Sequence, residues 1–454
     1  MKRAAAVILA AVPVLGTASP AAAHGLGGRL DLPVPLWLFV YGAAAVVVVS
    51  FVALGILWKR PRLEDGVRGR PLSDALQKPL TSRTVEWVVR IASLAVFLVV
   101  VVAAAGGAET AATNFAPVFV YVWFWVGLAF VHALLGNWWA TLSPWDTLAR
   151  LLGVGDQPRR AYPKAAGLWP AAGLLLAFLW MELVYPYSAN PRSLAVAIGV
   201  YSVITLVGMA VFSREAWNRH GEGFAVYFRL LSCIAPVARA LDGRVVLRPP
   251  LAGLPEVEPR PGLVPFIMVV IGSTTFDGLT GTQLWADWTR NLGTGGLVAA
   301  GTAGLLATIG AVTLAYVLSM MAASAVAGVP WHPLAVQFVH SLVPIAFAYV
   351  TAHYFSYLFL EGQSGIALAS DPFGFGWNLF GTAGYAVNFA LLSAVVIWYV
   401  QVAAIVAGHV AGVVLAHDRA MAAFRPGQAV RTQYALLAVM VLFTVGGLVI
   451  LSGG

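Results

Sequence analysis

Three side chains able to bind a metal ion or to move a proton lie inside long apolar segments of this 454-residue chain. Asp277 follows a run of hydroxyl residues, and His353 and Glu361 lie eight residues apart near the end of a later apolar segment. Charged side chains are costly in hydrocarbon, so residues of this kind are usually functional. One imidazole and two carboxylates form a ligand set suited to Zn, Mn or Fe, and equally suited to a proton relay. We predict that these three residues form one outward-facing site, with Asp277 and Glu361 as the catalytic groups.

Two further residues are predicted to surround this site. Tyr349 lies four residues before His353 and therefore shares its helix face, while Glu182 ends another apolar segment at a similar depth. Pro344 removes a backbone donor and predicts a kink in the helix that carries His353. Gly278 follows Asp277 among hydroxyl residues, which predicts that the helix breaks there and lines a polar pocket.

A second group of histidines lies toward the opposite ends of the apolar segments. His340 and His409 have matching predicted depths, since each lies a similar number of residues from its helix end at 1.5 Å per residue. They are predicted to face one another. The alternative inner site consists of His340, His409, His132 and His417.

The N-terminal residues predict a cleavable signal peptide over residues 1–23. Lys2 and Arg3 precede a short apolar stretch, and Ala21-Ala22-Ala23 offers a cleavage site. The mature chain would then begin at His24, whose free amine and imidazole are able to chelate Cu. His24 is therefore a further candidate metal ligand, with His353 as a third nitrogen.

The elements that must position these residues are membrane-spanning helices. Of all residues 60% are hydrophobic and 10% are charged, and the mean hydropathy is +0.83, which is outside the range of soluble domains. A bilayer core needs about 20 apolar residues per helix. An all-α bundle of ten spans is predicted, near residues 35–57, 88–106, 116–136, 167–185, 193–212, 262–283, 296–327, 331–360, 386–416 and 433–452.

The distribution of positive charge predicts the orientation of the bundle. Alternate gaps between the spans hold 22 of the 27 Lys and Arg residues, and short loops rich in these residues face the cytoplasm. Both ends of the mature chain are therefore predicted to lie outside. The same asymmetry accounts for the net charge of +8, so no nucleic-acid partner is expected.

A proline-rich linker divides the predicted chain. Residues 249–262 contain five prolines and separate a five-span half, 24–248, from a second five-span half, 263–454. The only cysteine, Cys233, falls on the predicted inner side, which excludes an intramolecular disulfide and a cysteine-bound Fe–S cluster. The sequence also lacks the ATP-binding, zinc-protease and serine-hydrolase motifs.

Several segments taken together resemble a known family. They are His24–Arg29, Thr275–Gly278, His353–Ser356 with Glu361–Gln363, and Ala407–Gly412 with Ala416–Arg419. Over nearly the whole mature chain they resemble polytopic proteins of high-GC bacteria that are labelled fenitrothion hydrolase. The resemblance implies hydrolysis of an organophosphorus ester in a bacterial cytoplasmic membrane, and it assigns no catalytic residue.

Three functions therefore remain open at the level of sequence. The first is a metal-assisted hydrolase of organophosphorus-type esters, in which Asp277, His353 and Glu361 hold a divalent metal that activates water. The second is a transporter that uses the same residues to relay protons or bind a cation. The third is a structural or assembly subunit. The expected partners are the lipid bilayer and a small ester or ion.

Overall fold

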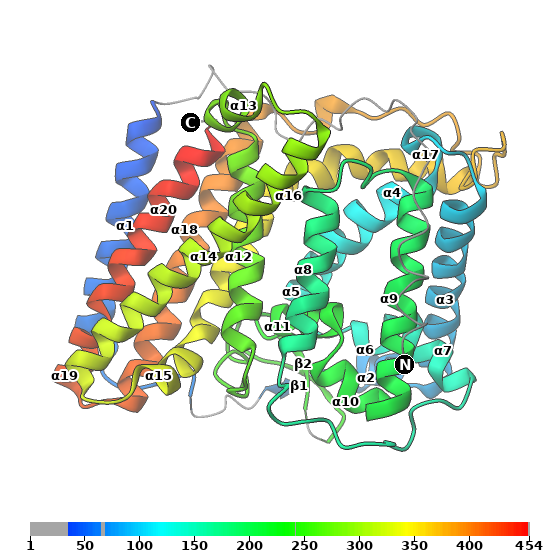
Figure 1. The fold of residues 1–454 in the computed structure, drawn as a ribbon. Coiled ribbons are helices and arrows are strands. Elements are labelled where there is room, and N and C mark those ends of the chain that lie inside the picture. The colour runs from blue at the N-terminus through cyan, green and yellow to red at the C-terminus, as the bar shows by residue number, and fades with distance from the viewer. Residues whose placement is uncertain (1–34, 65–68, 241, 453–454) are drawn as a thin grey trace, which may run out of the picture.

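Ten apolar helical segments form the body of the protein, as the sequence predicts. The structure is a computed structural model that describes residues 35–64, 69–240 and 242–452. Within these ranges ten segments are long and apolar enough to cross a membrane. The predicted signal peptide (1–23) and His24 lie outside the described residues. The side that carries the arginine-rich loops, predicted to be cytoplasmic, is called the inner side below and is the lower side in Figure 1.

Seven of the spans are continuous helices and three contain changes of helix type or a non-helical lead-in. The spans are α1 (Leu36–Leu57), α3 (Arg83–Gly106), α4 (Phe115–Val118) with η2 (Phe119–Gly127) and α5 (Leu128–Leu135), α8 (Trp169–Leu183) in a segment that begins at Lys164, α9 (Pro191–Phe212), α12 (Leu263–Thr280), α14 (Thr294–Ala327), α15 (Trp331–Phe338) with η3 (Val339–Leu342), α16 (Val343–Leu360), η4 (Glu361–Gln363) and α17 (Ser364–Ser370), α18 (Ala394–Ala423), and α20 (Tyr434–Leu451).

Short elements connect these spans. They are α2 (Asp74–Thr81), η1 (Ala111–Thr113), α6 (Trp139–Leu142), α7 (Pro144–Leu151), α10 (Arg214–His220), α11 (Gly223–Ser232), α13 (Gln283–Thr289), η5 (Phe389–Leu391) and α19 (Pro426–Thr432). A small antiparallel sheet on the inner side has the strand order β1 (Arg70–Pro71), β3 (Val245–Leu247), β2 (Val237–Arg239). The sheet joins the inner loop after α1 to the inner loop between α9 and α12, and the fold class remains all-α.

Two of the predicted helix irregularities have different outcomes. The helix type changes near Pro344, because the 3₁₀ segment η3 precedes α16 and Pro344 occupies the first turn of α16, while the predicted kink itself stays a prediction. The predicted break at Gly278 is wrong, since α12 continues to Thr280. The hydroxyl groups of Thr274 and Thr275 donate to backbone carbonyls one turn earlier. Their polarity is satisfied within the helix, so no break is needed.

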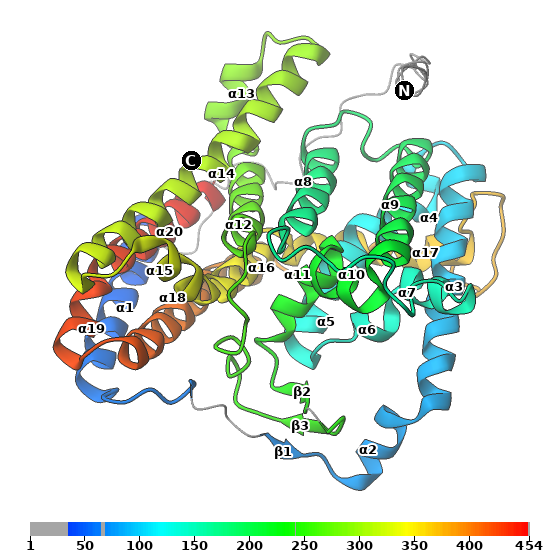
Figure 2. The same cartoon turned by 60° about the horizontal axis from the view of Figure 1, so that its bottom comes forward.

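The packing of the helices does not follow the order of the two sequence halves. The first span, α1, packs against α18 and α20 of the second half (Figure 1). The other spans of the first half, α3, η2–α5, α8 and α9, form a separate group, which Figure 2 shows beside the first. The two groups meet where α8 packs on α12 and where η2 and α11 pack on α16. The division at residues 249–262 stays a prediction, and it is not a division between packing groups.

Close packing of α16 on α18 depends on two glycines. A Cβ added to Gly408 would lie 2.2 Å from the Cβ of Ala348, and one added to Gly412 would lie 2.9 Å from the carbonyl of Ser341. Small residues let helix backbones approach closely in membranes. This contact fixes the position of the helix that carries His353.

Residues 222–241 mix Phe, Tyr, Leu and Arg, a composition that predicts a helix lying on the cytoplasmic surface of the membrane. The helix α11 of this segment is instead buried within the protein. Nine of its ten residues are buried, and it packs against α5, α8 and α16. Glu222 caps its first turn by accepting hydrogen bonds from the backbone N–H groups of Phe224 and Ala225, at 2.9 and 2.6 Å. The indole of Trp139 donates to the same carboxylate at 3.1 Å. With these partners Glu222 tolerates full burial.

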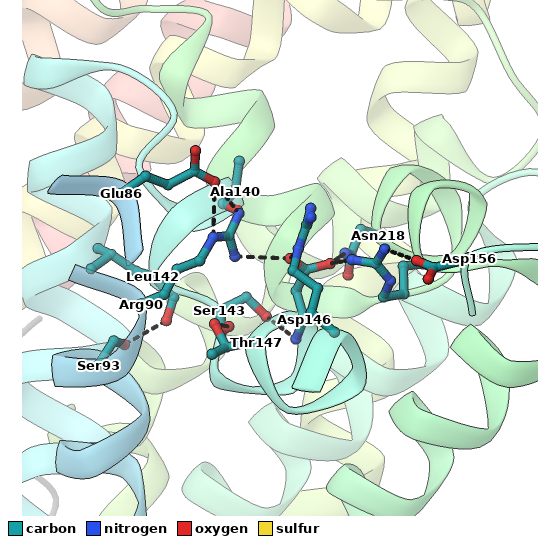
Figure 3. A network of polar contacts seen from close by, with 12 residues as sticks. Glu86, Arg90, Ser93, Ala140, Leu142, Ser143, Asp146, Thr147, Asp156 and Asn218 are labelled. Carbon is teal, nitrogen blue, oxygen red and sulfur yellow. Dashed lines mark hydrogen bonds and ion pairs between the residues drawn. The ribbon is translucent and has the colours of Figure 1, made fainter. Parts of the chain in front are cut away.

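A network around Asp146 ties α3, α7 and α10 together at the inner side (Figure 3). Oδ2 of Asp146 accepts from Arg90 at 2.9 Å and from Arg150 at 2.7 Å. Oδ1 of Asp146 lies 3.4 Å from Arg214 and 3.2 Å from the amide of Asn218. Arg90 and Asp146 are almost inaccessible, at 3% and 5% side-chain exposure. We call these five residues the inner network.

Candidate functional site

Asp277 and His353, two of the residues predicted to share a site, are in direct contact. The helix α12 carries Asp277 and the helix α16 carries His353 with its neighbour Tyr354. Nε2 of His353 lies 2.8 Å from Oδ2 of Asp277, and the hydroxyl of Tyr354 donates to the same oxygen at 2.7 Å. The side chains of His353 and Asp277 are 15% and 13% exposed. A carboxylate with two hydrogen-bond partners is thus held between two helices.

A second carboxylate lies beside this pair. Glu182 stands near the end of α8, close enough to Asp277 for the two charges to interact. Its Oε2 atom is inaccessible and has no hydrogen-bond partner among the described residues. We call Glu182, Asp277, His353 and Tyr354 the outer acidic cluster. The cluster lies where the two packing groups meet, because α8 belongs to one group and α12 and α16 to the other.

Tyrosine hydroxyl groups converge on this cluster from both packing groups. Those within electrostatic reach of Glu182 belong to Tyr121, Tyr227, Tyr354 and Tyr357. Tyr227 of α11 stacks on Trp125 of η2 with ring centroids 4.8 Å apart. The hydroxyl of Tyr227 and the indole nitrogen of Trp125 are both buried without a hydrogen-bond partner in the described structure. Unpaired polar atoms of this kind mark a place where water or a proton carrier fits.

His353 also borders a cavity of about 200 Å³ on the side away from Glu182. Residues of α12, α14, α16 and α20 line it, and they include Thr274, Thr275, Tyr349 and Gly447. Tyr349 and His353 face this cavity together, which confirms that they share one helix face. A water molecule takes up about 30 Å³, so the cavity has room for several.

The three-ligand metal site predicted over Asp277, His353 and Glu361 is not assembled. Glu361 is exposed at the start of the 3₁₀ turn η4, beyond the end of α16. The described residues contain no group of three or more His, Cys, Asp or Glu side chains able to hold a metal ion. Among the described residues, Asp277 and His353 alone supply too few donors for the predicted Zn, Mn or Fe site, and the Cu ligand predicted at His24 lies outside these residues. The reason is geometric, because the helix ends before its turn brings Glu361 back toward His353.

The inner histidines have separate local partners. His132 is satisfied at both nitrogens, with Nδ1 2.6 Å from the carbonyl of Leu128 and Nε2 accepting from the N–H of Trp139 at 2.8 Å. His417 contacts the carbonyl of Trp58 at 3.2 Å through Nε2. These two histidines hold loops and helix ends in place.

His340 and His409 are buried and share one feature. In each, Nδ1 lies 2.8 Å from a backbone carbonyl one turn earlier, and Nε2 has no partner within the described chain. No hydrogen bond or ring contact joins the two among the described residues. His409 instead packs on Tyr349, with ring centroids 6.0 Å apart. His409 is thus connected toward the outer acidic cluster through Tyr349.

Sequence reasoning missed the tyrosine partners of the acidic residues. Tyr354 follows His353 directly, so simple helix periodicity assigns it to a different face. Its reach to Asp277 depends on the packing of α12 against α16. Tyr227 belongs to α11, whose burial the sequence did not indicate. The available signal was the density of tyrosines in the segment from Tyr349 to Tyr357.

Comparison with known proteins gives no further assignment. No protein-family model, no curated protein sequence and no solved structure matches this chain.

Proposed function

We propose that this membrane protein conducts protons or couples proton movement to transport, with the outer acidic cluster as the group that takes up and releases the proton. The observation that supports this proposal is the direct His353–Asp277 contact beside the second carboxylate of Glu182. Intramembrane carboxylates and histidines commonly mark ion pathways and proton relays.

The charges of the cluster favour proton exchange. Two carboxylates that lie close together in a medium of low dielectric constant repel each other strongly. One imidazolium compensates only one of them. Protonation of Glu182 or Asp277 removes the remaining repulsion, and loss of that proton restores the repulsion. Small changes in the surroundings therefore shift the protonation of the cluster.

Further groups able to carry a proton lie on the inner side of the cluster. His353 and Tyr349 line the same cavity, and the ring of Tyr349 packs on that of His409, whose Nε2 is unpaired. His340 lies farther toward the inner side with an unpaired Nε2 as well. Water in the cavity would connect His353 with Tyr349, because both side chains are able to accept or donate a hydrogen bond. A relay that continues to His409 and His340 requires further water outside this cavity.

Hydrolysis of an organophosphorus ester, which the family resemblance implies, is the second candidate. The specific observation in its favour is the same contact, because a histidine oriented by a carboxylate is the arrangement of a general base. In this case His353 would activate water without a metal, and Asp277 would orient the imidazole.

One set of variants tests both candidates. Purified protein is placed in liposomes that contain a pH-sensitive dye, and proton flux is measured after a pH jump. Asp277→Asn and His353→Gln are expected to abolish the flux, because each removes a titrating member of the contact. Asp287→Asn is the matched control, since Asp287 is half-exposed and pairs with Arg290 on α13. This control is expected to conduct as the unmodified protein does.

The outcomes separate the proposals. Flux that is equal in all four proteins, or absent from the unmodified protein, contradicts proton conduction. Release of nitrophenol from a nitrophenyl phosphotriester by the unmodified protein, lost in His353→Gln but not in Asp287→Asn, supports the hydrolase instead. Inertness in both assays favours a structural role.

A further inference from the structure

A cavity of about 820 Å³ opens at the inner side, on the opposite face of the bundle from the outer acidic cluster. Its walls come from the segment around α6 and α7, from α10 and from α11. Four arginines line it, and they are Arg150, Arg214, Arg219 and Arg229. Its volume falls in the range of small-molecule sites. The question is which of these positive charges remain available to a ligand.

Most carboxylates near the cavity are already paired. Asp146 is held by the inner network, and Asp156 pairs with Arg214. Glu215 is exposed in the first turn of α10, where solvent and the helix N-terminus stabilise its charge. The remaining question is whether Arg219 and Arg229, the other two arginines of the cavity, also have acidic partners.

Arg229 on α11 differs from the other arginines of the cavity in its partners. It is partly buried, and within the described structure its guanidinium has no hydrogen bond and no ion pair. The charged side chains within electrostatic reach of Arg229 are Arg219, Arg260 and Glu258. A guanidinium carries five N–H donors, and burying it without an anionic partner is costly.

Glu258 does not fill this role. It accepts from Arg260 at 2.8 Å and lies 3.8 Å from Arg219. The hydrogen bond from Arg260 lowers the pKa of the Glu258 carboxyl, so this single negative charge is already shared by two cations. His220 adds no further positive charge near neutral pH, because burial lowers its pKa to about 4. Positive charge is thus in excess around Arg229.

We propose that this inner cavity binds an oxyanion, a phosphate group in chemical class, with Arg229 as the principal ligand and Arg219 at its side. Arginine presents a planar fork of donors that matches phosphate geometry. The phosphate belongs either to a soluble small molecule or to a lipid headgroup, and both carry the same recognition chemistry. This site is independent of proton conduction by the outer acidic cluster.

The test uses the full-length protein in detergent and inorganic phosphate as the probe. Phosphate is titrated at constant ionic strength against chloride while thermal denaturation is followed, because a ligand that binds only the folded state raises Tm. Arg229→Gln is expected to weaken phosphate binding by about tenfold or more, which is the order expected for one charge-assisted hydrogen bond. Arg431→Gln removes an exposed inner-side arginine and is expected to leave phosphate binding unchanged.

A lipid arm identifies the source of the phosphate. The same proteins are placed in nanodiscs of phosphatidylglycerol or phosphatidylcholine, and Tm is compared. Stabilisation by phosphatidylglycerol that disappears in Arg229→Gln, without a response to free phosphate, assigns a lipid headgroup. A response to free phosphate assigns a soluble ligand.

Two results would overturn the site. One is the absence of any Arg229-dependent response in both arms. The other is an equal loss in Arg229→Gln and Arg431→Gln, which indicates non-specific attraction to the basic surface. If Arg229→Gln does not fold, Arg229→Lys and Arg219→Gln are compared with the unmodified protein instead, since the first keeps the charge at residue 229 and the second removes only an exposed arginine of the proposed site.

Discussion

The inner network and the outer acidic cluster are both built around carboxylates that are largely removed from solvent, and they differ in how completely the polar atoms of those carboxylates are paired. Asp146 has four side-chain partners, three of them arginines (Figure 3). In the outer cluster, Glu182 has an oxygen without a hydrogen-bond partner in the described part of the chain and lies near a second carboxylate, which contacts His353. The paired network fastens helices together. The incompletely paired cluster is the one suited to exchanging a proton.

The largest expected effect is a loss of stability when the inner network is cut. Asp146→Ala leaves Arg90 and Arg214 buried without their shared anion, and removing one partner of a buried ion pair costs about 3–5 kcal/mol. Thermal denaturation in detergent measures the change.

Asp156→Ala is the matched control for that experiment. Asp156 pairs with the same Arg214, but its side chain is 61% exposed, and a pair of this kind contributes about 1 kcal/mol or less. Equal destabilisation by the two variants would remove the distinction between the buried network and its surroundings.

Removal of a carboxylate from the outer acidic cluster is expected to change stability little and to reduce proton flux. Glu182→Gln removes a partly buried charge that has no ion pair, so stability should change by no more than about 1 kcal/mol or rise slightly. Proton flux in liposomes should fall in the same variant. A loss of stability as large as that of Asp146→Ala would show that Glu182 is a structural residue as well.

A smaller effect is expected in the reactivity of Cys233, near the inner end of α11. Burial raises the pKa of its thiol, despite the nearby Arg248 and Arg229. The reactive thiolate is therefore scarce near neutral pH, and alkylation should accelerate only at higher pH. The control is Ala386→Cys in a Cys233→Ser background, because residue 386 is exposed in the loop before α18.

The same pair of cysteines also tests the predicted orientation. An impermeant reagent applied to intact cells should modify residue 386 and leave Cys233 unmodified. Modification of Cys233 under these conditions would reverse the orientation inferred from the positive charges.

The sequence was sufficient for the spans and for part of the site. Long apolar runs set the helices because a bilayer leaves few alternatives, and α1 begins and ends within a residue of its predicted limits. The contact of His353 with Asp277 was predicted from matching depth and from the cost of charge in hydrocarbon. Both inferences depend on the free-energy cost of placing polar groups in hydrocarbon, which can be judged from one sequence alone.

What the sequence could not reveal depends on contacts between distant helices. Depth alone placed Glu361 with His353, yet the end of α16 leaves Glu361 exposed in η4. The break expected at Gly278 does not occur, because hydroxyl groups of α12 bond within their own helix. The pairing of α1 with α18 and α20 has no local signal, and the burial of α11 follows from helices that surround it.

The central claim is that the outer acidic cluster gains and loses a proton on a carboxyl group. Infrared difference spectroscopy of the reconstituted protein, recorded between mildly acidic and alkaline pH, detects this step through the carbonyl band of a protonated carboxylic acid. A pH-dependent band that is lost in Glu182→Gln or Asp277→Asn and kept in Asp287→Asn is the predicted result. A spectrum in which all of these variants retain the same bands as the unmodified protein would contradict the account.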